Sequence, residues 1–163
     1  MGISKEVFQK TGGYVITRMA EDIEFSLRII AHGFKVALIS DAFVYHKRRT
    51  SLRAFYKQLH FFGRGRVNLG RYFPNEIKLV HWFPALFVLF FLFQFLLLLI
   101  DPRYFLVSIT GYLAFAVLIL LDAWYRNRSL KVGALSVSAA FTQLFAYGIG
   151  FLTELIRPSK SAT

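Results

Sequence analysis

The 163-residue sequence contains no cysteine and only 9 acidic residues. The absence of cysteine excludes disulfides, thiolate metal ligands and cysteine nucleophiles. The few Asp and Glu residues face 20 Lys and Arg, which leaves a formal net charge of +11. Such a charge suits either nucleic acid or an anionic membrane surface. Met1–Gly13 also lacks an apolar core of signal-peptide length, so we expect no cleavable signal there.

The distribution of hydrophobic and basic residues along the chain decides between nucleic acid and a membrane surface. Hydrophobic residues make up 56% of the chain, above the roughly 45–50% of a soluble domain, and nearly all of the excess lies after position 80. The basic residues crowd into Lys47–Lys78, directly before the first long apolar run. This placement favours membrane lipids as the partner of the cations, and we expect no nucleic acid.

Three apolar segments are long enough to cross a bilayer, which takes roughly 20 residues. We predict membrane spans at about 82–100, 104–121 and 135–156, within a membrane region covering 81–163. The first two lack the polar stripe of a helix in a soluble core. The third carries Glu154 near its end, where we expect the carboxylate to reach water.

The connections between these segments predict an orientation. Asp101-Pro102-Arg103 is typical of a tight turn at the water interface. The second connection, Asp122–Gly133, carries basic residues. By the positive-inside rule, the N-terminal segment and this second connection lie in the cytoplasm, and the C-terminal tail lies outside. We therefore expect a multi-pass protein of the cytoplasmic membrane.

Residues 51–80 predict an amphipathic helix and a linker. Apolar side chains at helical spacing, such as Leu52, Phe55 and Leu59, alternate with cations such as Arg53 and Lys57. The segment is too charged to span a membrane, and a basic amphipathic helix typically lies in the interface. The alternative is a helix that packs on a soluble domain.

Residues 1–50 have the pattern of an α/β domain. Ala20–His32 predicts a helix that begins with acidic residues and stops at Gly33. Lys35–Ile39 and Ala42–Tyr45 predict two short strands around a turn at Ser40-Asp41. One helix and two strands cannot bury a core by themselves. We therefore expect them to be the last part of a larger domain.

Four local features follow one another in this segment. They are Gly12-Gly13-Tyr14, Glu21-Asp22, Asp41 with His46, and Lys47-Arg48-Arg49. Each has an ordinary explanation: a turn, a complement to the helix dipole, an interfacial histidine and a lipid anchor, respectively. Together, and in this order, they resemble the C-terminal part of the catalytic domain of family-2 glycosyltransferases, a Rossmann-like domain of the glycosyltransferase A type. The resemblance covers roughly Gly12 to Tyr72.

The resemblance implies an inverting sugar transfer from a nucleotide-diphosphate donor to an acceptor hydroxyl. In the family, the aspartate of the acidic pair is the base, which places Asp22 in that role with Glu21 as its neighbour. A carboxylate suits this task because the acceptor proton must leave as the acceptor oxygen attacks. The implied substrate-binding residues are Gly12, Gly13, Tyr14, Arg48, Arg49, Gln58 and Arg64. His46 matches a position near the metal, a Mg²⁺ or Mn²⁺ ion held mainly by the nucleotide-binding half.

Two departures from the family pattern limit these expectations. The nucleotide-binding half, with its Asp-x-Asp metal site, does not occur in this sequence, so we expect a fragment that is inactive alone. Processive members carry Gln-x-x-Arg-Trp, whereas Gln58 is followed by Leu59-His60-Phe61-Phe62. We therefore expect a non-processive enzyme of cell-envelope polysaccharide synthesis, with a lipid-linked or saccharide acceptor.

Two other classes of protein are compatible with parts of the pattern. A non-enzymatic membrane anchor or assembly protein explains the spans and the basic helix, but not Glu21-Asp22 after Gly-Gly. A transporter or channel needs ionisable groups in its spans, and here the only strongly polar residues in the spans are Gln94, Gln143 and Glu154.

Overall fold

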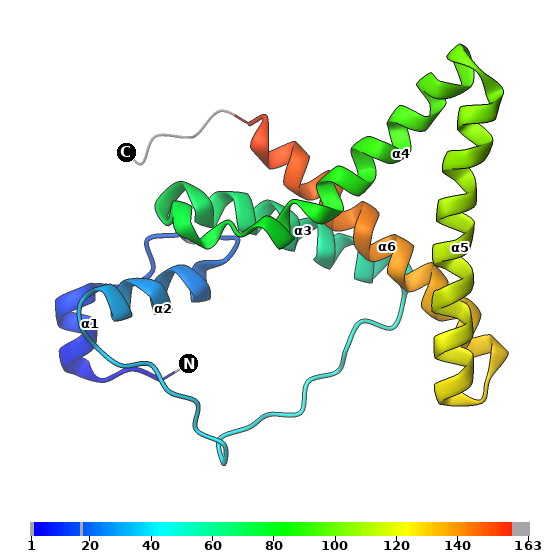
Figure 1. Ribbon diagram of the computed structural model, residues 1–163. Helices are drawn as coiled ribbons and strands as arrows, with labels where there is room; N and C mark the ends of the chain where they lie inside the picture. The colour runs from blue at the N-terminus through cyan, green and yellow to red at the C-terminus, as the bar shows by residue number, and fades with distance from the viewer. Residues whose placement is uncertain (1, 17, 158–163) are drawn as a thin grey trace.

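The computed structural model describes residues 2–16 and 18–157. Within these residues the chain is helical and forms no β-strand (Figure 1). The helices are α1 (Lys5–Thr11), α2 (Glu21–Ala31), α3 (Leu52–Tyr72), α4 (Phe83–Ile100), α5 (Pro102–Asn127) and α6 (Leu130–Leu155), with 3-10 turns η1 (Pro74–Glu76) and η2 (Leu79–His81). The tail that follows residue 157, expected outside the membrane, lies beyond the described residues.

Helix α2 confirms the helix predicted at 20–32. It begins at Glu21 and is followed by Gly33, whose φ of 81° favours glycine. Its apolar face is partly covered, since Phe25 and Ile29 are buried. Helix α1 precedes it and is capped by Ser4, whose hydroxyl accepts the Val7 amide at 3.3 Å.

The two strands predicted after α2 are not formed. Segments 35–39 and 42–45 have no regular secondary structure, and the turn between them closes with the Ala42 amide bonded to the Ile39 carbonyl at 3.2 Å. Their side chains are largely exposed, Leu38 at 93% and Tyr45 at 96%. A strand needs a neighbour to pair its backbone groups, and the described part of the chain provides none. The predicted α/β arrangement is therefore not present within these residues.

Helix α3 confirms the amphipathic helix predicted after residue 50, and its packing shows what its apolar face contacts. Ser51 caps it, with its hydroxyl accepting the Ala54 amide at 3.3 Å. The helix lies along the C-terminal half of α6 (Figure 1). Gly63 faces the Tyr147 carbonyl, and Gly150 of α6 faces the His60 carbonyl. Glycine at these contacts lets the two backbones approach closely.

Three helical stretches are long and apolar enough to cross a membrane: Leu79–Ile100, Pro102–Asn127 and Leu130–Leu155. They agree with the three predicted spans, and the protein is a membrane protein. Tyr112 is the one buried residue of α5, and most of the other large apolar side chains of this helix are exposed, as expected for a lipid-facing helix. At the first turn, Asp101 caps α5 by accepting the Arg103 amide at 2.8 Å.

The second connection is much shorter than predicted. Residues 122–127 continue α5, and α6 begins at Leu130. The extension of α5 is stabilised by an Asp122–Arg126 ion pair of 2.8 Å at helical spacing. Arg128 then adopts a left-handed conformation, and the Ser129 hydroxyl accepts the Val132 amide. Within the predicted connection, only Arg128 and Ser129 lie outside the helices, because these local contacts favour helix on either side of them.

The core of the molecule lies where α3, α4 and α6 meet. Val67, Ala85 and Phe151 are buried together there, and Trp82 packs edge-on against Phe151 at 4.9 Å between ring centroids. Farther along α4, the Phe87 ring touches aromatic rings from α5 and α6. Helices α4 and α5 form a hairpin, and α6 runs back across the start of α4 (Figure 1).

This crossing places the end of α6 beside α3. Arg71 of α3 donates to the backbone carbonyls of Glu154 and Arg157 at 2.8 and 2.9 Å. Gly148 lies against the Pro84 carbonyl at the start of α4. These contacts bring the C-terminal end of α6 beside α3; the expected orientation of the two ends across the membrane stays a prediction. The expectation that Glu154 reaches water was wrong, because its side chain is only 6% exposed.

Candidate active site

The predicted acidic pair stands at an abrupt helix start. Glu21 and Asp22 form the first turn of α2, and Met19 and Ala20 in front of them both have a φ of 67°. Residues other than glycine rarely adopt this left-handed conformation, and where they do they often mark a functional site. The positive end of the helix dipole stabilises negative charge at this position. The turn therefore presents two carboxylates at the N-terminus of α2.

A cleft of about 710 Å³ lies in front of these carboxylates. One wall comes from the start of α2 and the loop before it, and the other comes from α3 and α6. Its lining residues are Tyr14, Ala20, Glu21, Asp22, Ile23, Phe61, Phe62, Gly65, Arg66 and Tyr147. The cleft thus combines two carboxylates, one guanidinium and several aromatic rings. It lies between the N-terminal segment and α6, a helix that is apolar enough to span a membrane.

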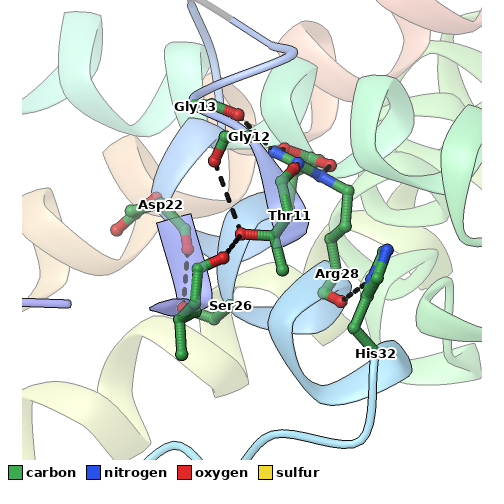
Figure 2. Close-up of polar contacts among 9 residues, drawn as sticks. Thr11, Gly12, Gly13, Asp22, Ser26, Arg28 and His32 are labelled. Carbon is green, nitrogen blue, oxygen red and sulfur yellow. Dashed lines mark hydrogen bonds and ion pairs between the residues drawn. The ribbon is translucent and has the colours of Figure 1, made fainter. Parts of the chain in front are cut away.

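The Gly-Gly loop is held against α2 by an arginine that the sequence analysis did not select. Arg28 donates to the carbonyls of Thr11 and Gly13, the latter at 2.6 Å (Figure 2). It also pairs with Glu24 at 2.7 Å. The Glu24 side chain is only 3% exposed. The spacing of four residues between Glu24 and Arg28 was the signal available in the sequence.

The two glycines themselves shape the loop and do not line the cleft. Gly12 has a φ of 72°, a conformation that favours glycine, and it caps the end of α1. Tyr14, two residues later, does reach the cleft, with its ring 5.0 Å from that of Phe25. The loop therefore positions Tyr14 beside the acidic pair.

On α3, the structure divides the basic residues differently from the prediction. Arg64, expected to bind substrate, pairs its Nε with Glu154 Oε2 at 2.8 Å and faces α6. Gln58 is not among the residues that line the cleft. Arg66 does line it, and the sequence offered no signal to choose between two arginines two positions apart. The choice depends on how α3 is rotated on α6.

Helix α3 also touches the turn that precedes the acidic pair. A Cβ placed on Gly65 would lie 3.6 Å from the Ala20 Cβ, and the Asn68 side-chain amide lies 3.5 Å from the Met19 carbonyl. These contacts set the distance between Asp22 and the α3 wall of the cleft.

His60 of α3 has a lowered pKa. Partial burial and then the charge of Arg64 lower the pKa of His60 below its usual 6.5, so His60 is neutral at pH 7.

The remaining predicted site residues lie outside the cleft. His46, Arg48 and Arg49 stand exposed on the extended segment between α2 and α3. Within residues 2–16 and 18–157, no group of three or more His, Asp or Glu side chains is arranged to hold a metal ion. Mg²⁺ is usually bound by one or two carboxylates together with waters and substrate phosphates, so protein residues alone seldom complete its coordination. The described residues therefore do not fit a complete divalent metal site.

Most of the chain is similar to a known protein family. A family model described as "Glycosyl transferase family group 2" matches residues 1–126 of the 163. The match covers the N-terminal segment, α3, α4 and nearly all of α5. No curated protein and no solved structure matches the chain significantly.

Proposed function

The chain belongs to glycosyl transferase family group 2, and from this premise we propose that it transfers a sugar from a nucleotide-diphosphate donor to an acceptor at the cytoplasmic membrane. The observation that supports the proposal is the cleft that Asp22 and Arg66 line together with aromatic side chains of α3 and α6. A carboxylate, a cation and apolar rings beside a membrane helix suit an acceptor that carries both hydroxyl groups and an apolar part.

In the proposed reaction, Asp22 acts as the general base. Its carboxylate takes the proton of an acceptor hydroxyl while the hydroxyl oxygen forms a bond to the anomeric carbon of the sugar. The bond from that carbon to the diphosphate breaks on the opposite face, so the configuration inverts and the diphosphate leaves with the electron pair. The N-terminus of α2 stabilises the negative charge that a base requires. Glu21 stands beside Asp22 as a second acceptor of hydrogen bonds from the sugar hydroxyls.

Other predicted residues keep proposed roles in binding the donor. Developing charge on the leaving diphosphate needs cations, and Arg66 lies in the cleft, while Arg48, Arg49 and His46 lie on the exposed segment. No Asp-x-Asp motif occurs in the sequence. We expect donor and metal binding to depend on residues from outside this stretch, completing an α/β domain with residues 1–50. The described chain alone is then inactive.

The proposed acceptor is lipid-linked or a saccharide held at headgroup level. Phe61 and Phe62 of α3 and Tyr147 of α6 form the apolar side of the cleft. A lipid carrier would place its head near Asp22 and its chain along these rings, whereas a saccharide would stack on them. The many cations of α3 support a cytoplasmic N-terminal segment through the positive-inside rule, and nucleotide sugars are found in the cytoplasm. The departure at Gln58 favours the addition of single sugars.

The substitution Asp22→Asn tests the assignment of the base. It keeps the shape of the side chain and removes its basicity, so we expect sugar transfer by the full-length gene product to fall by about 10²–10⁴-fold. Transfer is measured with radiolabelled nucleotide sugar in membranes. Glu6→Gln, which changes an exposed ion pair on α1, is the matched control and should retain activity. Normal transfer by the Asp22→Asn variant would show that another group is the base.

A further inference from the structure

Glu154 is a buried carboxylate near the end of a helix that is otherwise mostly apolar. Its side chain is 6% exposed, and each of its oxygens has an arginine partner on α3: Arg64 Nε at 2.8 Å from Oε2, and Arg71 Nη1 at 3.3 Å from Oε1. Replacing a buried ion pair by apolar side chains is often neutral or stabilising. Stability alone therefore does not explain this cluster, and its geometry points to a role in fixing how α3 sits on α6.

The two arginines hold the last turn of α6 from one face of α3. Arg64 and Arg71 are seven residues apart, so they lie about two helical turns apart on the same side of α3. Arg71 additionally donates to the carbonyls of Glu154 and Arg157 at 2.8 and 2.9 Å. Both carbonyls lie at or just beyond the end of α6, where the helix supplies few donors of its own. The cluster thus joins the side chain and the backbone of the α6 terminus to α3.

Two glycine contacts set the spacing of the same pair of helices. Gly63 faces the Tyr147 carbonyl, and Gly150 faces the His60 carbonyl. A methyl group at either position would collide with backbone atoms. Close glycine contacts restrict the distance between the helices, but a helix can still rotate or slide on such a smooth surface. The Glu154 cluster restrains that rotation.

The rotation of α3 matters because its other face forms a wall of the cleft. Successive residues of an α-helix are about 100° apart around the axis. When Arg64 points to Glu154, Gly65 and Arg66 point toward Ala20 and the cleft. We propose that Glu154 is a positioning residue: through Arg64 and Arg71 it sets the rotation of α3 that presents Arg66 and Phe62 to the acceptor beside Asp22. This role in catalysis rests on the proposed function.

Disulfide trapping tests the mechanical part of the proposal in the chain itself. The sequence has no cysteine, so an Ala20→Cys/Gly65→Cys pair adds the only two thiols. Their Cβ atoms would stand 3.6 Å apart, within the range of disulfides. In lipid nanodiscs under a mild oxidant, we expect Glu154→Gln to slow closure of the bridge about tenfold or more, because the charged hydrogen bonds that restrain α3 are lost.

Two further variants keep this measurement decisive. Asp122→Asn breaks an exposed ion pair on α5, with side chains 61–73% exposed, and should leave the rate of closure unchanged. Arg71→Gln removes a cation and leaves Glu154 paired with Arg64, and it replaces Glu154→Gln if that variant does not give a monodisperse, helical protein. If the disulfide forms in the Glu154→Gln or Arg71→Gln protein as fast as in the cysteine-pair protein with both native residues, the proposal is wrong.

Acceptor kinetics in the full-length gene product, measured with and without the Ala20→Cys/Gly65→Cys disulfide as a tether, test the proposed role of Glu154 in catalysis. We expect Glu154→Gln to raise the acceptor KM about tenfold or more, in line with the loss of charged hydrogen bonds, and to leave kcat nearly unchanged. Because Ala20 and Gly65 line the cleft, the reference is the Ala20→Cys/Gly65→Cys protein with native Glu154; oxidation of the pair should bring the KM of the Glu154→Gln protein back to that of this reference, and a reductant should reverse the effect. An unchanged KM, or a raised KM that the tether does not restore, would show that Glu154 serves only the packing of α6. If the unmodified protein transfers no sugar, the proposed function fails, while the closure rates still decide the role of Glu154 in restraining α3.

Discussion

Single residues in the N-terminal segment divide into those that face the cleft and those that hold it in place. Asp22 and Tyr14 face the cleft, whereas Arg28 and Glu24 lie behind it and connect the Gly-Gly loop to α2. Arg28 satisfies two loop carbonyls and neutralises a carboxylate that is almost fully buried. The position of Tyr14 relative to Asp22 therefore depends on a residue that contacts no substrate in the proposed reaction.

Arg28→Met should loosen this loop. The substitution leaves the Glu24 carboxylate buried without its partner, which typically costs about 3–5 kcal/mol. We expect faster hydrogen exchange and proteolysis across residues 5–31 of the chain in nanodiscs. Lys10→Met, which breaks the exposed Lys10–Glu6 pair of 2.9 Å, is the control, and its effect should stay at or below about 1 kcal/mol. Equal protection in both variants would mean that Arg28 does not hold the loop.

His60 should make the packing of α3 sensitive to mild acid. Its pKa is lowered in the folded protein by partial burial and by Arg64, so the unfolded chain takes up the proton first as the pH falls. The contribution of neutral His60 to the free energy of unfolding is complete above pH 6.5, and it is lost as the pH falls toward the lowered pKa of the folded protein. We expect the unfolding temperature to drop between pH 7.5 and 5.5, and to drop less in His60→Asn. His46→Asn, which changes an exposed histidine outside the helices, should not reduce the drop.

Among the elements, α3 and α6 make the most specific contact in the described part of the chain. The amphipathic pattern of α3 predicted a helix, and the composition of α6 predicted a membrane span, but neither pattern predicted that the two would lie against each other. Their contact uses glycines at the close approach and the Glu154 cluster at its end. The cleft depends on this contact, since its second wall comes from both helices.

Gly63→Ala should separate α3 from α6. The added methyl group would meet the Tyr147 backbone, and overpacking of this kind typically costs about 1–3 kcal/mol. Gly111→Ala in α5 is the matched control, because nothing lies within 4 Å of its added methyl group, and alanine in a helix gains up to about 1 kcal/mol over glycine. Thermal unfolding in detergent should show a lower midpoint for the first variant only. Equal midpoints would argue against close α3–α6 packing.

The whole molecule combines a lipid-facing hairpin of α4 and α5 with a second part in which α3 packs against the end of α6. The last residues of α6 are bonded to α3, and Gly148 lies on the first turn of α4. Helix α6 is long and apolar enough to span a membrane, but its contacts place its C-terminal end with α3. The arrangement predicts that the end of α6 and the N-terminal segment face the same side of the membrane.

Labelling of single thiols in sealed vesicles checks this arrangement. Thr50→Cys lies just before α3, Ile156→Cys lies at the end of α6 with the native side chain 83% exposed, and Arg103→Cys lies at the turn between α4 and α5. We expect a membrane-impermeant maleimide to react with the first two from one side and with the third from the other. Reaction of Thr50→Cys and Ile156→Cys from opposite sides would contradict the arrangement.

The sequence by itself determined the features that depend on neighbouring residues. Apolar runs, the capped turn at Asp101 and the spacing of α2 and α3 predicted these helices because each signal lies within one element. The Glu21-Asp22 pair at a helix start was predicted for the same reason. The strands at 35–39 and 42–45 were not formed because a strand needs a partner from another part of a sheet, and the pattern of one segment does not supply it.

Only the tertiary structure decided which face of each helix lines the cleft and which face packs against another helix. Arg64 was expected in the site and instead pairs with Glu154, 90 residues away along the chain, while Arg66 takes the place in the cleft. Glu154 was expected in water and is buried for the same reason. These outcomes follow from the rotation of α3 on α6, which is set by contacts between distant residues. A local pattern predicts that a helix forms, but it does not determine which surface that helix will meet.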